Sequence, residues 1–418
     1  MTTRKVLVIG GGAAGMLAAL FAAREGASVS ILERNEKLGK KIYITGKGRC
    51  NLTNAAELEE FMRAIVRNPR FLYAAFASFD NKDMMQLMEN LGVPLKVERG
   101  NRVFPESDHA SDVTNGLRRE LERKKVRICY DTRVEHLILE GQRCCGVILE
   151  SGEKLFADAV IICTGGASYP TTGSTGDGYR LAQEAGHSIQ KPMGALVPIE
   201  TRESWPSMLS GLSLKNVALR AWKTGGKKKK YFYDEQGEML FTHFGVSGPL
   251  VLTLSSYLPE DLKDVRMAID LKPALDEQTL DARLLRDFQE YSRKQLTAVM
   301  DGLVPHNLGQ QILVLAGISP QTPVNSVTQA QRATILQLLK ALPLTPKGLR
   351  GFNEAIVTRG GVTVKEINPS TMESKLASGL YFAGEVMDVD AHTGGFNLQI
   401  AFSTGALAGK NAAMEEEI

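Results

Sequence analysis

The sequence lacks the features of secreted, membrane-spanning and strongly charged proteins. Its five cysteines include no CxxC pair, and an odd number of cysteines cannot all pair in disulfides. This fits a reducing compartment better than a disulfide scaffold. The formal net charge of +3 is too small to indicate a polyanionic partner by itself. Glycines interrupt the first apolar run within residues 10–15. We therefore expect neither a signal peptide nor a membrane span, and we expect a cytoplasmic location.

The composition is that of an ordinary globular protein with room for more than one core. Hydrophobic residues make up 43% of the chain and charged residues 23%, which is close to the average for soluble domains. A chain of 418 residues exceeds one ordinary hydrophobic core, so two or three lobes are expected.

The N-terminal segment has the pattern of a dinucleotide-binding βαβ unit. Lys5–Ile9 is an apolar run of strand length, and GGGAAG and a helix-like stretch follow it. Gly10, Gly12 and Gly15 form a GxGxxG motif, and Glu33 ends the next strand-like run. The first glycine permits a tight turn, the second lets backbone approach a pyrophosphate, and the third lets the helix pack on the strand. The acid would accept hydrogen bonds from ribose hydroxyls, so the motif predicts FAD or NAD.

Changes in sequence pattern along the chain predict a discontinuous first domain. From about residue 191, prolines and short alternating runs indicate a β-rich part, and helical spacing follows it. After about residue 351 a short strand, a Gly-Gly turn and a helix of small residues return to the first pattern. We predict an α/β fold with a Rossmann-like domain of residues 1–190 and 350–418, a β-rich insert of residues 191–275, and a helical subdomain of residues 276–349.

Four segments carry a resemblance to one family. They are VIGGGAAG, TGKGRCNLTN, GEMLFTHFGVSGP and TMESKLASGLYFAGEVMDVDAHTGGFNLQIAFSTG. Together they resemble the BaiN/RdsA-type FAD-dependent oxidoreductases, in the glutathione-reductase-like flavoprotein group, over nearly the whole chain. The resemblance implies a Rossmann-like FAD-binding domain and reduction of a carbon–carbon double bond. No second GxGxxG opens another strand–turn–helix unit, so NAD(P)H would reach the flavin without a domain of its own, or a partner protein would supply electrons.

The resemblance also implies which residues hold FAD. They fall into an ADP-binding half, a loop bordering the flavin, a turn near the adenosine, an acidic strand end, and the start of the last helix. In that order they are Gly10, Gly12, Ala14, Gly15, Glu33 and Arg34; Gly48, Arg49, Cys50 and Asn51; Thr164 and Gly165; Gly384, Glu385 and Asp388; and Gly395, Phe396, Asn397 and Leu398. The helix N-terminus would stabilise negative charge on the reduced flavin. Phe396 stands where tyrosine is more common and Ala391 where glycine is common, and neither departure removes the predicted FAD site.

Cys50 has two interpretations. Lys47 and Arg49 closely precede it, and nearby cations favour a thiolate by lowering the thiol pKa. At the reactive face of the flavin it could protonate a substrate carbon. The alternative is a small residue in a loop that passes the ring closely. No second cysteine lies within a few positions, which disfavours a disulfide oxidoreductase.

Two further residues are candidates for catalysis. His243 in LFTHFGVSGP lies between a strand and a Gly-Pro turn, and a purely structural role is its alternative. Arg102 in GNRVFPES would either approach an anionic ligand or lie in solvent. Asp388 and Asp390 resemble a carboxylate pair, but with so few histidines near them no metal site is expected.

The substrate is predicted from the charge of the insert. Residues 191–232 hold nine Lys and Arg against two Asp and Glu. Lys223 and Lys227–Lys230 lie among Trp222, Tyr231 and Phe232, a mixture that contacts phosphates and stacks on bases. A solvated hairpin tip is the alternative. The resemblance includes relatives implicated in reducing a uridine of 23S ribosomal RNA to dihydrouridine. A small unsaturated metabolite, enone-like or steroid-like, is the second candidate substrate.

Overall fold

The apolar run that opens the chain becomes the middle strand of a parallel sheet in the computed structural model. β1 (Lys5–Ile9) pairs in parallel with β10 (Ala159–Ile162) on one side and β2 (Ser28–Leu32) on the other. β20 (Leu380–Phe382) and β6 (Arg127–Cys129) complete the sheet in the order β20-β10-β1-β2-β6. Parallel strands covered on both faces are apolar along nearly their whole length, which is why β1 and β10, inside the sheet, have hydrophobic sequences.

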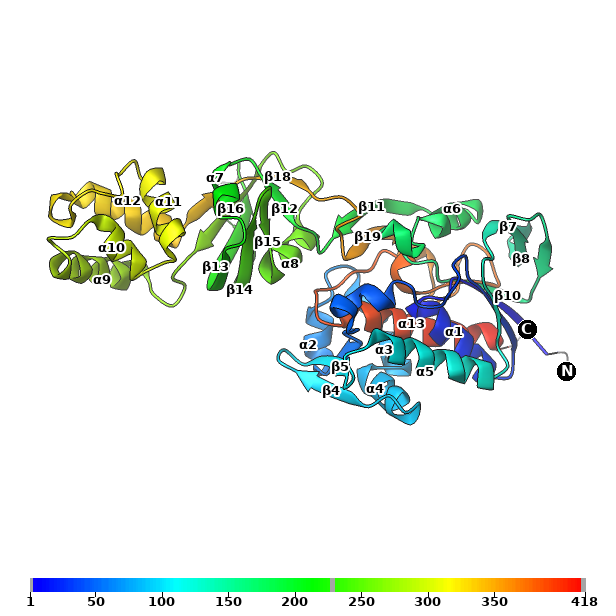
Figure 1. The fold of residues 1–418 in the computed structure, drawn as a ribbon. Coiled ribbons are helices and arrows are strands. Elements are labelled where there is room, and N and C mark those ends of the chain that lie inside the picture. Colours follow the sequence, from blue (N-terminus) through cyan, green and yellow to red (C-terminus); the bar gives the residue numbers. More distant parts are fainter. Residues whose placement is uncertain (1–2, 226–229, 415–418) are drawn as a thin grey trace. The chain divides into compact units, whose positions relative to one another are not determined.

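The chain divides into two units, within which the structure describes residues 3–225 and 230–414. Unit 1 comprises Met1–Ala195 and Phe352–Ile418, and unit 2 comprises Leu196–Gly351 (Figure 1). The Rossmann-like unit is thus discontinuous, with β-rich and helical parts inserted, and the predicted fold class is confirmed. The predicted boundaries stay predictions. Residues 342–349, at the end of the predicted helical subdomain, form strands of the unit 2 sheet.

The two ends of the chain meet through a close helix contact. α1 (Ala13–Arg24) lies beside α13 (Phe396–Ala413), the blue and red helices of Figure 1. A Cβ built on Gly405 would lie 2.3 Å from the carbonyl oxygen of Ala14, and one on Gly409 would lie 2.0 Å from that of Ala18. Glycines four residues apart share one helix face, so the two backbones touch along that face.

The remaining elements of unit 1 surround this core as small antiparallel sheets and short helices. They are β3 (Thr53–Asn54), α2 (Leu58–Arg63), α3 (Tyr73–Ser78), α4 (Asn81–Asn90), β4 (Leu95–Glu98), β5 (Arg102–Pro105), α5 (Ala110–Arg123), β7 (Val134–Glu140), β8 (Arg143–Leu149), β9 (Lys154–Phe156), α6 (Asp177–Glu184), β11 (Ile189–Ala195) and β19 (Val357–Val362). Short 3-10 turns occupy Ile42–Gly48, Pro69–Leu72, Pro170–Thr172, Val364–Glu366 and Gly384–Val386.

Unit 2 is built on a sheet with the strand order β17-β16-β13-β14-β15-β12-β18. Along β13, Leu219 and Ala221 are buried in the core, while Arg220 and Trp222, which alternate with them, lie on the opposite face. Its strands are β12 (Ile199–Thr201), β13 (Ser213–Lys223), β14 (Tyr231–Thr242), β15 (Gly245–Ser247), β16 (Val265–Asp270), β17 (Leu342–Leu344) and β18 (Pro346–Leu349). Its helices are α7 (Trp205–Met208), α8 (Pro249–Tyr257), α9 (Glu277–Glu290), α10 (Leu296–Asp301), α11 (His306–Leu315) and α12 (Gln329–Lys340), with a 3-10 turn at Val324–Ser326. Among the described residues, no helix is long and apolar enough to cross a membrane.

The contact between α1 and α13 predicts that a larger residue at Gly409 lowers the stability of the protein. Gly409→Val places side-chain atoms where Ala18 O already lies, so the helices must separate, and we expect a loss of roughly 1–3 kcal/mol of unfolding free energy. Urea unfolding followed by circular dichroism measures the change. Lys410→Ala, at the exposed neighbouring position, is the control, and we expect it to stay within about 0.5 kcal/mol of the parent. A Gly409→Val protein that unfolds at the parent urea concentration would contradict the contact.

A buried histidine predicts how the stability of unit 1 depends on pH. His187 is 3% exposed, and its Nε2 lies 2.7 Å from Ser374 Oγ. Its Nδ1 lies 3.3 Å from Glu366 Oε2 but has no hydrogen-bond partner among the described residues. Burial lowers the pKa of His187, and the nearby Glu366 opposes this only in part. The folded protein therefore holds a neutral ring.

Below a pH of about 6.5 His187 is protonated in the unfolded chain but stays neutral in the folded chain, because its pKa is lower there. We expect the unfolding free energy to fall as the pH drops from that value to the pKa of His187 in the folded protein. The His187→Gln variant should show a weaker dependence on pH. Unfolding free energies measured between pH 5 and 8, the range in which histidine titrates, test it. His306→Gln, at an exposed site, is the control. An unchanged slope in His187→Gln would refute the assignment.

Candidate functional site

The turn after β1 packs tightly against the sheet, whereas the space beside the start of α1 holds no atom of the described residues. Gly10 has φ +98, and a Cβ there would lie 2.7 Å from Cys163 O. A Cβ on Gly15 would lie 1.9 Å from Gly10 O, so the helix packs directly on the turn. By contrast, no described atom lies within 4 Å of a Cβ built on Gly12, the N-cap residue of α1. The backbone N–H groups there are accessible, and this fits the approach of a pyrophosphate.

Glu33 lies beside this turn and is 6% exposed. Its Oε2 accepts a hydrogen bond from Gly11 N at 2.7 Å, and its Oε1 accepts from Asn35 N at 2.8 Å and Asn35 Nδ2 at 2.6 Å. An ionised carboxylate has about four acceptor sites. Glu33 is therefore fixed in orientation and retains an acceptor site, and its predicted hydrogen bond with a ribose hydroxyl stays a prediction.

The loop of residues 45–50 is curled by left-handed backbone conformations. Gly46, Lys47, Gly48 and Cys50 have φ values of +57, +60, +88 and +60. Such a conformation costs a non-glycine residue about 1 kcal/mol or more, so the surrounding contacts must hold it. Cys50 N donates to Thr45 O at 3.1 Å and closes the curl.

The surroundings of Cys50 do not favour a thiolate, and the choice between its two interpretations stays a prediction. The side chain is fully buried, and burial raises the pKa of the Cys50 thiol to about 12, although a hydrogen bond with Thr45 opposes the shift. Arg49 does not face the sulfur. Its Nε donates to Asp108 Oδ1 at 2.8 Å, it also pairs with Glu98, and its guanidinium lies over the Phe104 ring. Desolvation therefore decides the state of the thiol.

The end of this loop meets the start of α13, more than 300 residues later. The Asn51 amide, oriented to suit its neighbours, accepts from Gly395 N and donates to Thr53 O, both at 3.1 Å. Asn54 Nδ2 donates to Gly394 O at 3.0 Å. A Cβ on Gly395 would lie 2.3 Å from Thr53 O, so only glycine fits there. Two segments that the resemblance assigned to the flavin are thus in direct contact.

The first side chains of α13 turn back into the protein. Phe396 is buried edge-to-face against Phe61, with ring centroids 4.7 Å apart. Asn397 clamps the preceding loop, because its Oδ1 accepts from Ala391 N and its Nδ2 donates to Ala391 O, both at 2.9 Å. Leu398 is partly buried. Since the N–H groups of a first helical turn have no intrahelical acceptor, this end of α13 presents backbone donors rather than side chains.

The acidic strand end is already bonded to the protein. Glu385 accepts from Lys41 Nζ at 2.8 Å, from Ser168 Oγ at 2.9 Å and from Thr358 N at 2.9 Å. Asn68 Nδ2 donates to the carbonyl oxygen of Asp388 at 2.6 Å and to its carboxylate at 3.2 Å. These residues tie segments together, and their predicted contact with FAD stays a prediction. The sequence pattern gave no sign of the role of Lys41, which precedes the TGKGRC segment.

The other predicted residues lie in several places. Thr164 and Gly165 follow β10, and Gly165 has φ +72. Arg102 is exposed and donates from Nε to Arg99 O, in unit 1. His243 is exposed in unit 2, in the turn between β14 and β15, with its ring edge-to-face on Phe244. The catalytic roles of Arg102 and His243 stay predictions. Lys223 and Lys230 are exposed, and Lys227–Lys229 lie outside the described residues.

The parallel sheet, the glycine turn and the buried acid define a Rossmann-type dinucleotide-binding protein. A family model described as "HI0933-like protein Rossmann domain" matches residues 4–411. The chain belongs to this family.

Curated relatives agree with the family. The chain is 33% identical to the 3-dehydro-bile acid delta(4,6)-reductase of Clostridium scindens, over 98% of this chain and 99% of the relative. It is 31% identical to the ribosomal RNA dihydrouridine synthase of Haemophilus influenzae, over 95% and 96%, and 30% identical to that of Escherichia coli, over 95% of each. The resemblance drawn from the four segments is thus confirmed, and the protein is a member of a family of FAD-dependent oxidoreductases.

Solved structures show a similar fold. A 3-ketosteroid-delta4-(5alpha)-dehydrogenase from Rhodococcus jostii RHA1 matches with a TM-score of 0.53 and 16% identity, covering 99% of this chain and 97% of that chain. At this identity the likeness concerns the fold alone.

The buried thiol predicts that Cys50 is dispensable for proton transfer. Cys50→Ala should retain its FAD and its turnover, and lose only the stability of a small buried side chain, because a thiol with a pKa of about 12 is a poor acid at neutral pH. Flavin absorbance and steady-state turnover measure this. Cys144→Ala removes another buried thiol, in β8, and is the matched control. A fall in turnover of about a hundredfold in Cys50→Ala alone, the scale of general acid catalysis, would contradict the prediction.

Proposed function

We propose that this protein is an FAD-dependent reductase of a carbon–carbon double bond, and that its substrate is a uridine of 23S ribosomal RNA, which it reduces to dihydrouridine. The observation that carries the flavin assignment is the contact between the loop of residues 45–54 and the N-terminus of α13, in the unit that holds the open turn at Gly12. NAD(P)H is the proposed electron donor, and the cytoplasm the proposed location.

The protein's own residues bind and orient the cofactor. The N–H groups at Gly12 and the start of α1 bind the pyrophosphate, and Glu33 accepts from ribose hydroxyls. The N-terminus of α13 donates to the pyrimidine edge of the ring system and stabilises negative charge there. Asn51 and Asn397 hold that helix end in place. When bound and reduced by NAD(P)H, the flavin would supply the hydride for one carbon of the double bond, and an acid or solvent would supply the proton for the other.

The β13–β14 hairpin of unit 2 supports an RNA substrate. The rings of Trp222 and Tyr231 meet edge-to-face at 5.8 Å, and the Arg220 guanidinium lies 5.7 Å from the Tyr231 ring centroid. Lys223 is exposed at the end of β13, and Lys230 is exposed directly before β14. Aromatic rings stack on bases that have left their helix, and lysines contact phosphates.

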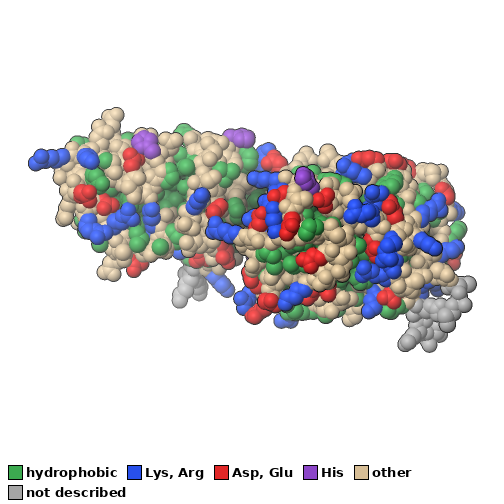
Figure 2. Space-filling model, turned by 60° about the horizontal axis from the view of Figure 1, so that its bottom comes forward, with side chains coloured by type: hydrophobic (Ala, Val, Ile, Leu, Met, Phe, Trp, Pro, Cys, Tyr) green, Lys and Arg blue, Asp and Glu red, His purple; other side chains and the backbone are tan. Residues whose placement is uncertain are grey.

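The charge pattern on one face of the molecule bears on the role of this hairpin. On the face shown in Figure 2, Lys and Arg side chains are interspersed with Asp and Glu, in keeping with a net charge of +3. No uniform positive field covers the described residues of that face, so RNA affinity would depend on a local basic cluster. Two curated relatives are named ribosomal RNA dihydrouridine synthases, and these names also support an RNA substrate.

A small unsaturated metabolite is the second candidate substrate. The observation that favours it is the 33% identity to a bile acid reductase, over nearly the whole of both chains. In this case the lysines of the hairpin serve only solubility, and RNA binding is weak and unaffected by their removal.

Replacing Lys223 and Lys227–Lys230 by glutamine separates the two substrates. If RNA is the substrate, binding of ribosomal RNA should weaken, and the slope of log affinity against log salt should decrease by about 0.7–0.9 for each phosphate that the protein no longer neutralises. Lys154→Gln, on an exposed strand of unit 1, is the control and should leave both unchanged. Flavin absorbance of each variant shows whether the cofactor site is intact.

Deleting the gene tests the substrate in the cell. We expect a dihydrouridine to disappear from the large-subunit ribosomal RNA and to return when the parent gene is restored. An unchanged modification map, together with turnover of enone-like compounds by the purified protein, would establish the metabolite instead. A purified protein that stays colourless and binds no added FAD would refute both.

A further inference from the structure

The segment between β10 and α6, residues 163–176, reaches across the carboxyl end of the parallel sheet. It leaves the end of β10, and it contacts Asn35 beyond the end of β2, because Asn35 Nδ2 donates to Thr172 O at 3.2 Å. A Cβ on Gly173 would lie only 2.6 Å from the same nitrogen. Since β1 lies between β10 and β2 in the sheet, the segment passes over the carboxyl end of β1. Dinucleotides bind at that place in open parallel sheets.

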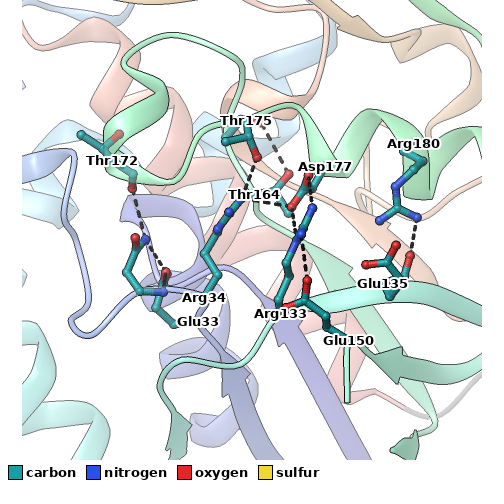
Figure 3. A network of polar contacts seen from close by, with 12 residues as sticks. Glu33, Arg34, Arg133, Glu135, Glu150, Thr164, Thr172, Thr175, Asp177 and Arg180 are labelled. Carbon is teal, nitrogen blue, oxygen red and sulfur yellow. Dashed lines mark hydrogen bonds and ion pairs between the residues drawn. The ribbon is translucent and has the colours of Figure 1, made fainter. Parts of the chain in front are cut away.

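Charged side chains hold the end of this segment in place (Figure 3). Arg34 Nη1 donates to Thr175 Oγ1 at 2.6 Å and to Asp177 Oδ2 at 3.1 Å. Arg133, just before β7, reaches the same carboxylate with Nε at 3.2 Å. Asp177 is the first residue of α6, and its side chain is 20% exposed. One carboxylate thus joins residues that follow β2, precede β7 and begin α6.

Arg34 directly follows Glu33, the acid that faces the glycine turn. Any ligand that reaches Glu33 therefore lies next to the fastened segment. The contacts of Arg34 and Arg133 to Asp177 are charge-assisted and partly shielded from water, which makes them stronger than neutral hydrogen bonds. The segment is also held by the bonds from Arg34 to Thr175 and from Asn35 to Thr172, so loss of the carboxylate removes the charged part of its attachment and weakens the rest.

We propose that residues 172–177 form a latch over the adenosine half of the cofactor, and that Asp177, held by Arg34 and Arg133, is the positioning residue that keeps it closed. This proposal rests on the proposed FAD function. FAD leaves when the contacts to Asp177 open, so these contacts set the rate of cofactor release. They do not touch the reacting atoms, and turnover at saturating FAD is independent of them.

The test measures FAD release directly. Asp177→Asn keeps the shape of the side chain and removes its charge, so release, followed by the fluorescence of free flavin after dilution, should be about tenfold faster or more. Asp177→Glu restores the charge and should recover part of the slow release. Glu184→Gln, on the same helix, breaks pairs to Arg180 and His136 outside the latch, and should release FAD at the parent rate.

The possible results distinguish a failure of the latch proposal from a failure of the proposed FAD binding. If the parent binds FAD and Asp177→Asn releases it at the parent rate, or if Glu184→Gln accelerates release equally, the latch is refuted and the flavin assignment stands. If the parent takes up no FAD, both are refuted. Should Asp177→Asn fail to fold, Thr175→Val removes the hydrogen bond from Arg34 and leaves the carboxylate intact. Faster release in that variant supports the latch, and an unchanged rate refutes it.

Discussion

The direct contact between the backbones of α1 and α13 is the constraint on which the rest of unit 1 depends. Gly405 and Gly409 let α13 approach the carbonyl oxygens of Ala14 and Ala18. Because α1 begins at the glycine turn and α13 begins at Gly394-Gly395, the same contact fixes the distance between two helix N-termini. Both termini present uncapped N–H groups, and both favour negative charge on a ligand. A side chain between the helices would move one anion-binding end away from the other.

The carboxylates around these ends are occupied by the protein itself. Glu33 is bonded to backbone and amide N–H groups, Glu385 to Lys41, and Asp177 to two arginines. A free carboxylate beside a pyrophosphate would repel it, whereas a carboxylate that is already paired contributes little field. Glu385 and Asp177 therefore serve to join distant segments, Glu33 keeps an acceptor site, and the backbone donors are left for an anionic ligand. This arrangement suits a cofactor with phosphates at one end and a ring that becomes negative on reduction at the other.

Cys50 illustrates how far the neighbours of a residue in sequence differ from its neighbours in space. Two cations closely precede it in the chain, yet Arg49 pairs with Glu98 and Asp108 while the sulfur is fully buried. The left-handed turns at residues 46–50 separate the direction of the guanidinium from that of the thiol. The pKa of a thiol depends on its surroundings within a few ångströms, and the loss of hydration there exceeds the effect of charges that face another way.

The sequence by itself determined the first βαβ unit, the family, and the return of the chain's end to the first domain. These follow from local rules: a strand buried on both faces is apolar throughout, a tight turn needs glycine, and small residues permit close helices. Only the tertiary structure decided the ionisation of Cys50, the partners of Glu385 and Asp177, and the clamp that Asn397 makes on Ala391. Those states depend on burial and on contacts between segments as much as 344 residues apart, and no local pattern encodes which distant group will be nearest.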